Sequence, residues 1–232
     1  MSEKTKLWYL ENFNMFSELN DSNMEILNNI SRMRTVTKSQ PIYFAHDPST
    51  SIFFLKKGRV KLTRTSPDGK EMILALINAG EVFGEMSILE EQDRTDFAIA
   101  LDDCLICAIS KDDFKSFIEK NPAINNKITR LIGLRLRKYS KHIEDLVFKD
   151  ATGRVVSFIL TLANEQGKKI GDEIFVKPFL THKDIAELTA CSRQTVNFIL
   201  TDLRQKNIIN FDRKKLIINK EDELRKLAGV LK

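Results

Sequence analysis

Residues 181–203, THKDIAELTACSRQTVNFILTDL, predict two short helices separated by a tight turn. Thr181 and Asp184 have the spacing of a capping box, which satisfies the free backbone N–H groups at a helix start. Ser192 can cap a second helix, whose apolar residues recur every three or four positions and so form one buried stripe: Val196, Ile199, Leu200 and Leu203. Two helices in this arrangement are typical of a helix-turn-helix, whose second helix enters the major groove of DNA.

Four residues of the second predicted helix lie outside that stripe, and we call them the reading face: Arg193, Gln194, Asn197 and Phe198. An arginine can donate two hydrogen bonds to guanine, and glutamine or asparagine can make a two-bond contact with adenine. Phe198 is suited to a thymine methyl group, and packing against the neighbouring helix is an equally good alternative. The reading face therefore predicts sequence-specific contact with bases.

Residues 208–219, IINFDRKKLIIN, predict a β-hairpin with a basic tip. Arg213 and Lys214 lie near this tip, where they are suited to DNA phosphates. Solubility alone would also explain a basic tip, but a hairpin directly after two DNA-reading helices favours the phosphate role. His182, just inside the first helix, is a further candidate for a phosphate contact. We predict that the following residues contact DNA: Thr181, His182, Ser192, Arg193, Gln194, Asn197, Phe198, Arg213 and Lys214.

The excess positive charge is confined to the last third of the chain. Of the 37 Lys and Arg and the 32 Asp and Glu residues, 22 of each fall in residues 1–150, which leaves 15 basic against 10 acidic residues in 151–232. The net charge of +5 therefore lies entirely in the part that contains the helix pair and the hairpin. This asymmetry indicates a neutral module joined to one that faces nucleic acid, although five charges also suit an ordinary solvated surface.

Composition excludes several classes of protein. A chain of 232 residues with 42% hydrophobic residues is long enough for one large or two small domains with real cores. It has no run of about 18 uncharged apolar residues, and residues 1–6 show no export signal. Three cysteines do not make a disulfide framework in a chain of this size. We therefore expect a cytoplasmic protein without membrane contact, and collagenous and disordered chains are excluded.

The region before the long helix predicts a small antiparallel β-roll or barrel. Apolar residues in 7–33 recur at helical spacing, and residues 66–69, Ser-Pro-Asp-Gly, have the residue types of a tight hairpin turn. Short β-rich runs of regular spacing are typical of such rolls. The predicted strands are residues 41–44, 51–55, 60–63, 72–77, 98–101 and 105–109.

A long helix is predicted after Asn121, with apolar residues spaced by four, three, four and three: Ile132, Leu136, Tyr139, Ile143 and Leu146. Charged residues flank this seam, Arg135 among them. A narrow seam on so long a helix favours pairing with a second copy, and the alternative is packing on its own domain. Asp150 is predicted to cap the next helix. The expected divisions are therefore a sensor domain in 1–120, a dimerisation helix in 121–149 and a DNA-binding domain in 150–232.

Taken in order, four stretches of the chain resemble the Crp/Fnr family of bacterial transcription regulators. They are residues 42–48 with 53–62; residues 83–89, FGEMSIL, followed by Arg94 and Thr95; residues 150–154, DATGR; and residues 185–196, IAELTACSRQTV. The resemblance covers about Phe13 to Asn219. It implies an α+β fold: an N-terminal cyclic-nucleotide-binding β-roll, a long dimerisation helix and a C-terminal winged helix-turn-helix.

The resemblance also implies where an effector binds. Cyclic-AMP-binding members hold the nucleotide with a Gly-Glu pair and an Arg followed by Ser or Thr. By this resemblance, Gly84 would allow close backbone approach and Glu85 would accept hydrogen bonds from the ribose hydroxyl. Arg94 with Thr95 would hold the cyclic phosphate. Guanidinium and hydroxyl groups suit that phosphate. The adenine-contacting positions of the long helix are Tyr139 and Ser140 here. The alternative for the predicted phosphate and ribose contacts is that Glu85 and Arg94 form a structural ion pair in a roll that binds nothing.

This chain departs from the pattern of cyclic-AMP binders in several places. Asp96 stands where these members have a small residue, and a carboxylate disfavours a nearby phosphate. Tyr139 replaces the usual threonine, and His46 replaces a glycine common in that loop of the roll. The effector is therefore expected to be cyclic AMP or another cyclic nucleotide, and a cyclic dinucleotide, a non-nucleotide effector or no effector stay open.

No required cofactor, metal site or catalytic residue is predicted, so we expect no enzyme. Cys104 and Cys107 face opposite sides of a strand and are expected in the core, and Cys191 is expected to be buried. We expect a homodimeric, allosteric regulator of transcription that binds double-stranded DNA at an inverted repeat, with RNA polymerase as a further partner. The alternative is a cyclic-nucleotide-responsive module whose C-terminal helices bind protein.

Overall fold

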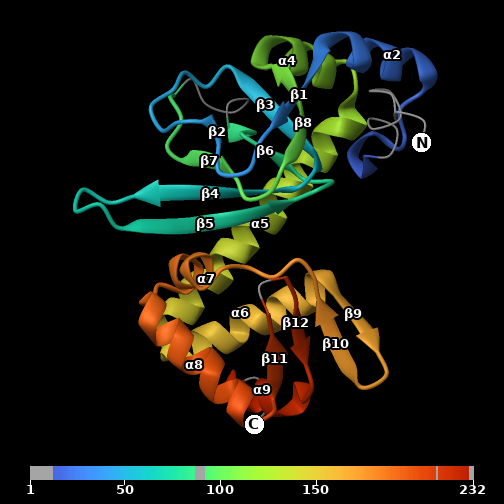
Figure 1. Ribbon diagram of the computed structural model, residues 1–232. Helices are drawn as coiled ribbons and strands as arrows, with labels where there is room; N and C mark the ends of the chain where they lie inside the picture. The colour runs from blue at the N-terminus through green and yellow to red at the C-terminus, as the bar shows by residue number, and fades with distance from the viewer. Residues whose placement is uncertain (1–12, 87–91, 213, 230–232) are drawn as a thin grey trace. The chain divides into compact units, whose positions relative to one another are not determined.

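The computed structural model of the chain describes residues 13–86, 92–212 and 214–229 (Figure 1). The chain forms two compact units, residues 1–136 and residues 137–232. Helix α5 (Pro122–Phe148) begins in the first unit and ends in the second. Among the described residues, no helix combines the length and the apolar character that crossing a membrane requires.

Two four-stranded antiparallel sheets dominate the N-terminal unit. The first has the order β1-β8-β3-β6 and the second the order β2-β7-β4-β5 (Figure 1). The helical segments of this unit, besides the start of α5, are η1 (Asn14–Phe16), α2 (Asp21–Ile30) and α4 (Lys111–Glu119). The strands are β1 (Ser31–Val36), β2 (Pro41–Tyr43), β3 (Ser51–Lys57), β4 (Arg59–Thr65), β5 (Glu71–Asn78), β6 (Val82–Phe83), β7 (Phe97–Ala100) and β8 (Cys104–Ser110).

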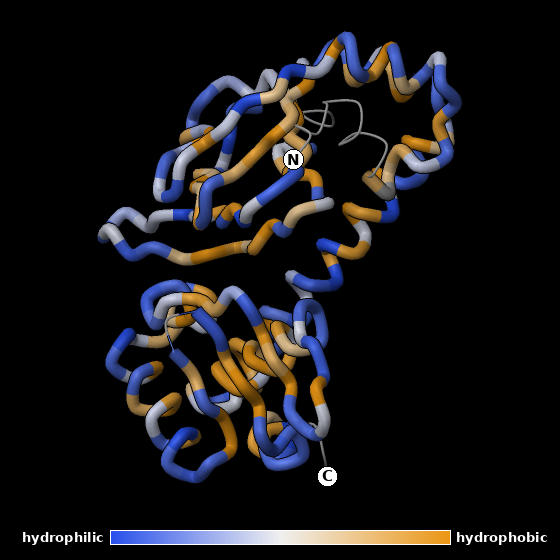
Figure 2. Tube along the Cα trace, turned by 45° about the vertical axis from the view of Figure 1, so that its right-hand side comes forward, coloured by the Kyte–Doolittle hydropathy of each residue, from blue (hydrophilic) through white to orange (hydrophobic). Residues whose placement is uncertain are grey.

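The first sheet is buried on both faces, which explains the almost continuous apolar run of β3. Phe53 and Leu55 face a core shared with the second sheet, whereas Ile52 and Phe54 alternate with them and face a second core shared with α2, α4 and the start of α5. Hydrophobic residues accordingly follow these strands in Figure 2. Because both faces of the sheet are buried, β6 and the buried residues Gly84 and Glu85 that follow it are held by close packing.

Each of the six predicted strands coincides with an observed one, so the expected roll is confirmed. Cys104 and Cys107 are buried in the two different cores, as their spacing on β8 predicts. Strand β1 and helix α4 were not expected. The hydroxyl of Ser110 accepts a hydrogen bond from the Asp113 N–H at the start of α4, a capping signal that was readable in the sequence.

The C-terminal unit packs helices against a four-stranded antiparallel sheet of order β11-β12-β10-β9. Residues 164–171 are polar and contain two glycines, which is typical of a loop, but α6 continues to Gln166 and β9 follows at once, completing the sheet beside β10. The elements of this unit, besides the end of α5, are α6 (Ala151–Gln166), β9 (Gly167–Ile170), β10 (Glu173–Val176), α7 (His182–Thr189), α8 (Arg193–Gln205), β11 (Ile209–Phe211), β12 (Leu216–Ile218) and α9 (Glu221–Leu227).

The predicted helix caps are confirmed. Asp150 accepts a hydrogen bond from the Gly153 N–H at 2.7 Å, and Thr181 and Asp184 form the reciprocal capping box at the start of α7. Ser192 caps α8 through the Thr195 N–H at 3.0 Å. Helix α8 then buries the stripe expected for it, beginning at Val196. These caps fix where both helices of the pair begin, and hence which residues α8 exposes.

Candidate effector site and nucleic-acid interface

Arg94 lies inside the N-terminal unit with only 6% of its surface exposed. Its Nη1 donates to the carbonyl of Gly84 at 3.0 Å, its Nη2 donates to the carbonyl of Ser51, and its guanidinium carbon lies 4.4 Å from the centre of the Tyr43 ring. Burial lowers the pKa of Arg94, but a guanidinium remains charged in proteins. Its Nε has no hydrogen-bond partner among the described residues. The site therefore holds a buried cation with unused donor capacity.

Position 84, beside this arginine, is suited to glycine. Its φ is +70°, a conformation that glycine adopts at little cost. An added Cβ would lie 2.7 Å from Nη1 of Arg94 and 3.1 Å from the ring of Phe53. The close backbone approach expected of this glycine is thus made to Arg94 itself.

Glu85 pairs with Arg135 of α5, so the expected alternative of a Glu85–Arg94 ion pair is wrong. Nη1 of Arg135 lies 2.6 Å from Oε1 of Glu85, and Nη2 of Arg135 donates to the carbonyl of Val82 at 2.6 Å. The two side chains are only 6% and 14% exposed. Arg135 is therefore more than a charged flank of the helix seam. Fifty positions separate it from Glu85, and no local sequence pattern links the two.

Asp96 is directed into this cluster through a hydrogen bond from the Tyr43 hydroxyl at 3.2 Å. Burial raises the pKa of the Asp96 carboxyl, while the Tyr43 hydrogen bond and the charge of Arg94 lower it again. Burial also raises the pKa of Tyr43, and the charge of Asp96 adds to this effect. The carboxylate that seemed to oppose a phosphate is therefore partly neutralised by groups of the roll.

The remaining predicted effector residues lie in less enclosed places. Thr95 is exposed, and its carbonyl accepts a hydrogen bond from Arg64 at 3.2 Å. Tyr139 is half-buried and Ser140 exposed, and both belong to the part of α5 in the second unit. The structure thus brings Gly84 and Arg94 into direct contact and gives Glu85 a partner on α5.

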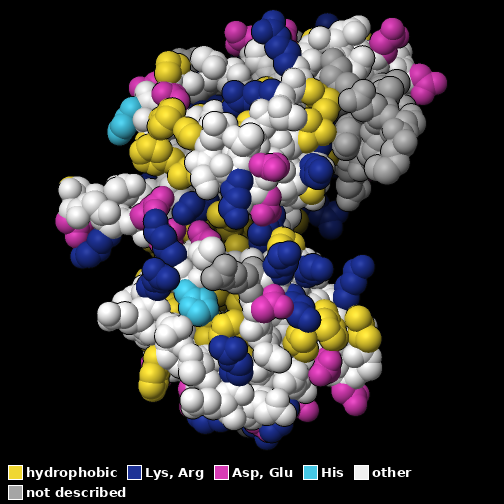
Figure 3. Space-filling model, viewed as in Figure 1, with side chains coloured by type: hydrophobic (Ala, Val, Ile, Leu, Met, Phe, Trp, Pro, Cys, Tyr) yellow, Lys and Arg dark blue, Asp and Glu magenta, His cyan; other side chains and the backbone are white. Residues whose placement is uncertain are grey.

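The reading face of α8 is open to solvent. Arg193, Gln194, Asn197 and Phe198 are all exposed, and Phe198 exposes 74% of its surface. The hydroxyls of Thr181 and Ser192 are engaged in the helix caps. In the view of Figure 3, Lys and Arg side chains are spread over the C-terminal unit. Exposed planar polar groups above a buried stripe are what a helix in a DNA groove requires.

His182 lies beside the reading face. The side chain of Asn197 lies within reach of its imidazole for a hydrogen bond. Burial lowers the pKa of His182, the charges of Arg193 and Arg204 lower it further, and the Asn197 hydrogen bond raises it. The imidazole is therefore neutral at pH 7 and carries one donor and one acceptor nitrogen.

The basic hairpin is present as β11 and β12, which we call the wing (residues 209–218). Lys214 is exposed, and the backbone N–H groups of Lys214 and Lys215 donate to Oδ1 of Asp212 at 2.7 and 3.0 Å. This carboxylate fixes the backbone of the tip. Arg213 lies outside the described residues.

Cys191, in the turn between α7 and α8, is half-buried, so the prediction that it is buried is wrong. The reason is its partner: the guanidinium of Arg154 reaches the turn, donating to the Thr189 carbonyl at 2.8 Å and to Sγ of Cys191 at 3.5 Å. Arg154 also donates to the Lys149 carbonyl at 3.0 Å. It thereby ties the turn of the helix pair to the segment that joins α5 and α6.

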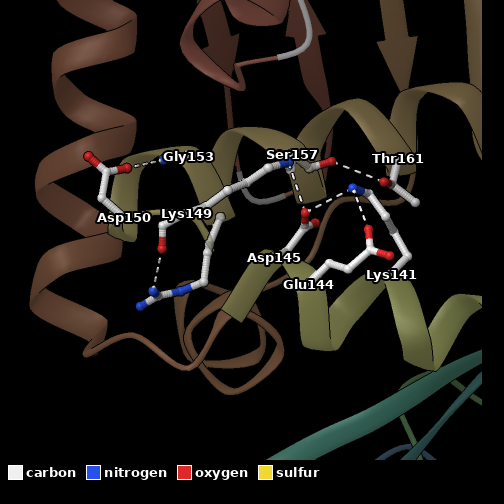
Figure 4. Close-up of polar contacts among 9 residues, drawn as sticks. Lys141, Glu144, Asp145, Lys149, Asp150, Gly153, Ser157 and Thr161 are labelled. Atoms are coloured by element: carbon white, nitrogen blue, oxygen red, sulfur yellow. Dashed lines mark hydrogen bonds and ion pairs between the residues drawn. The ribbon is translucent and has the colours of Figure 1, made fainter. Parts of the chain in front are cut away.

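A polar network surrounds that junction (Figure 4). Asp145 forms ion pairs with Lys149 at 2.9 Å and Lys141 at 3.3 Å, and Lys149 also donates to the hydroxyl of Ser157 on α6. Figure 4 shows the chain of contacts running from the last turns of α5 into α6. The network therefore links the end of α5 to α6, which packs against α7 and α8.

Throughout the described residues, no group of three or more His, Cys, Asp or Glu side chains is placed to hold a metal ion.

Comparison with known protein families gives two matches. Residues 33–121 match the family model of the cyclic nucleotide-binding domain, and residues 153–227 match that of the Crp-like helix-turn-helix domain. The first match contains Arg94 and its surroundings, and the second contains the reading face and the wing.

Individual proteins agree with these matches. A CRP-like cAMP-activated global transcriptional regulator of Mycobacterium tuberculosis is 30% identical over 191 residues, which cover 82% of this chain and 85% of that protein. The global nitrogen regulator of a Nostoc species is 32% identical over 190 residues, covering 81% and 85%. In fold, the chain is similar to a CooA variant of Carboxydothermus hydrogenoformans, with a TM-score of 0.78, 23% identity and 98% of both chains covered.

Proposed function

Because this chain belongs to the Crp/Fnr family of DNA-binding transcription regulators, we propose that it acts as a homodimer whose affinity for DNA is set by a small effector in the β-roll. The observation that carries the proposal is the exposed reading face of α8 within residues 151–232, which hold the whole net charge of the chain. Residues 1–120 serve as the sensor, 121–149 as the dimerisation helix and 150–232 as the DNA-binding domain.

The reading face accounts for sequence specificity. Arg193, Gln194 and Asn197 contact base edges, Phe198 contacts a thymine methyl group, and His182, Thr181 and Ser192 lie at the phosphates. Arg213 and Lys214 of the wing bind the backbone of the DNA. Two copies related by a two-fold axis must reach major grooves about 34 Å apart, so the target is an inverted repeat.

The homodimer is supported by apolar residues that α5 leaves exposed. Leu136 and Ile143 are seven residues apart and expose 64% and 60% of their surfaces, and Val147 and Phe148 expose 67% and 81%. Such residues on one helix gain burial when a second copy of the helix packs against them. Leu136→Asp with Ile143→Asp should therefore convert the protein to a monomer in sedimentation velocity.

The effector is a cyclic nucleotide, with cyclic AMP the first candidate. Arg94 supplies a buried guanidinium with a free Nε, and phosphate oxygens are the preferred partners of such a group. Gly84, Glu85 and Thr95 complete the site on the roll, and Tyr139 with Ser140 contact the base. That the Mycobacterium tuberculosis relative is named as cAMP-activated supports this choice.

A second candidate is a regulator of the same family with a non-nucleotide effector or none. It is favoured by the engagement of Glu85 with Arg135 and by the Asp96 carboxyl beside Arg94. Both observations describe groups that a cyclic nucleotide would have to accommodate. The Nostoc relative is named a global nitrogen regulator, and that name mentions no nucleotide.

Regulation follows from the contacts of the long helix. An effector that binds one arrangement of α5 better than another shifts the population toward that arrangement. The Asp145–Lys149–Ser157 network and Arg154 then pass the change to α6 and the turn of the reading pair. The protein works in the cytoplasm, catalyses no reaction and acts on transcription together with RNA polymerase.

Isothermal titration of the full-length protein with cyclic AMP, cyclic GMP and cyclic di-GMP tests the effector. We expect saturable binding of one of them, which is lost in Arg94→Met and weakened in Thr95→Ala. The Thr95 side chain is exposed, so its removal should leave the fold intact. Lys206→Met, a surface change in the other unit, should bind as the unaltered protein does. Absence of binding for all three nucleotides would support the second candidate.

A further inference from the structure

Phe211 ends β11 at the base of the wing and is only half-buried. Its backbone pairs with Leu216 of β12, which is fully buried, as is Ile209 two positions earlier. The core of the hairpin is therefore filled by these aliphatic residues. The Phe211 ring lies at the rim, where it meets two basic side chains as well as the buried Phe179.

Three segments of the C-terminal unit meet at this ring. The guanidinium carbon of Arg204, in the last turn of α8, lies 4.3 Å from its centre. The imidazole of His182, at the start of α7, lies 5.6 Å away with the planes inclined by 66°. Phe179, before α7, lies 6.2 Å away and donates its backbone N–H to the Lys214 carbonyl at 3.0 Å.

An aliphatic side chain of the same volume does not reproduce these contacts. The negative face of an aromatic ring attracts a guanidinium, and its geometry favours edge-to-face packing with a second ring. Phe211 thus restricts both the Arg204 side chain and the His182 ring. His182 in turn lies within hydrogen-bond reach of the side chain of Asn197 on the reading face.

We propose that Phe211 is a positioning residue for base recognition: it holds His182, and through His182 it orients Asn197 for its contact with DNA. The proposal rests on the DNA-binding function proposed above. It extends that function because His182 becomes part of the base-reading geometry, beyond a contact with phosphate. The wing and the reading helix are then linked by side chains as well as by the backbone between them.

The test uses Phe211→Leu in the full-length protein, with Phe211→Tyr as the variant that keeps the ring. Phe175→Leu is a matched control, because Phe175 is a half-buried aromatic residue of β10 in the same sheet. The probe is a duplex selected from a random library by the unaltered protein, together with copies changed at single base pairs. Circular dichroism and thermal unfolding check that each variant folds.

Asn197→Ala identifies the base pair that Asn197 reads, because discrimination is lost at that position. At the same base pair, we expect Phe211→Leu to reduce the preference for the selected base about fivefold. Preferences at the other positions should stay within about twofold, and Phe211→Tyr and Phe175→Leu should discriminate like the unaltered protein. In a His182→Ala background, Phe211→Leu should have no further effect on this preference, because the connecting residue is already absent.

An equal loss at all base pairs, or an undiminished effect in the His182→Ala background, would overturn the positioning role and leave Phe211 a structural residue. The same holds if Phe211→Leu discriminates normally. These outcomes concern the inference alone, since each requires that the unaltered protein selects DNA. If it selects none, the proposed function fails first.

Discussion

Removing Arg135 should destabilise the N-terminal unit strongly, because the change leaves the Glu85 carboxylate buried without its ion pair. The two groups meet at 2.6 Å with 6% and 14% of their side chains exposed, so water can replace the lost partner only poorly. Breaking a buried pair from one side costs about 3–5 kcal/mol. Arg135→Met also removes the hydrogen bond to the Val82 carbonyl, which places the expected loss of unfolding free energy in that range.

The companion variants separate the pair from its surroundings. Glu85→Gln leaves a neutral acceptor for Arg135 and should cost about 1–2 kcal/mol. The double variant, with neither charge, should be about 2 kcal/mol more stable than the sum of the single losses predicts. Lys206→Met breaks an exposed pair with Asp202, 58% and 41% exposed, and should change stability by less than about 0.5 kcal/mol.

Urea unfolding followed by circular dichroism measures these differences, at one protein concentration because association also contributes to stability. The reasoning is refuted if Arg135→Met unfolds at the urea midpoint of the unaltered protein, or if the two single changes are additive. Either result means that the buried pair carries no net coupling. In that case Glu85 is as available to a ligand as it would be without Arg135.

Three further predictions follow from separate features. Arg193→Ala should weaken binding to the selected duplex by about 1–3 kcal/mol and reduce base discrimination at one position. Lys214→Ala should weaken binding to all duplexes alike and reduce the salt dependence of binding. Fluorescence anisotropy measures both effects. His46 has a φ of +70°, so His46→Gly should change the free energy of unfolding by less than about 0.5 kcal/mol, while His46→Val should lower it by about 1 kcal/mol or more in urea titration. Asp150→Ala removes the cap of α6 and should lower stability by about 1 kcal/mol, and Asp150→Ser should restore most of that loss.

Local patterns in the sequence were enough to predict the roll and the helix pair. Alternation and turn residues located six strands, because each strand of such a roll carries its own signal. The spacing of Thr181, Asp184 and Ser192 located the first residue of both α7 and α8. These features depend on neighbours within a few positions, which a single sequence displays.

Helix α4 has a local signal in the Ser110 cap, but the other unpredicted features depend on distant partners. Strand β1 has little alternation of its own and is specified by pairing with β8, so its polar sequence resembled the end of a helix. Strand β9, Gly-Lys-Lys-Ile, is formed by its pairing with β10. Arg135 reaches Glu85 across the fold, and Arg154 reaches the turn at Cys191 in the same way. Side-chain pairs of this kind are set by tertiary packing, which spacing along the chain does not reveal.

His46 illustrates what geometry adds to a resemblance. Its position is commonly glycine in the family, and the sequence alone offered no physical reason for the exchange. The positive φ explains the glycine, since that conformation is strained for most side chains. In this chain His46 adopts that conformation, and its backbone N–H donates to the Arg94 carbonyl at 2.8 Å.

The most direct test of the account is selection of DNA by the full-length protein from a random duplex library, with and without the nucleotide that binds in titration. We predict an enriched inverted repeat whose half-sites are centred about one helical turn apart. We also predict tighter or weaker binding when the nucleotide is added, and loss of enrichment for Arg193→Ala at one position of each half-site. Recovery of no sequence, or of a single half-site without its repeat, would contradict a homodimer that reads DNA through α8.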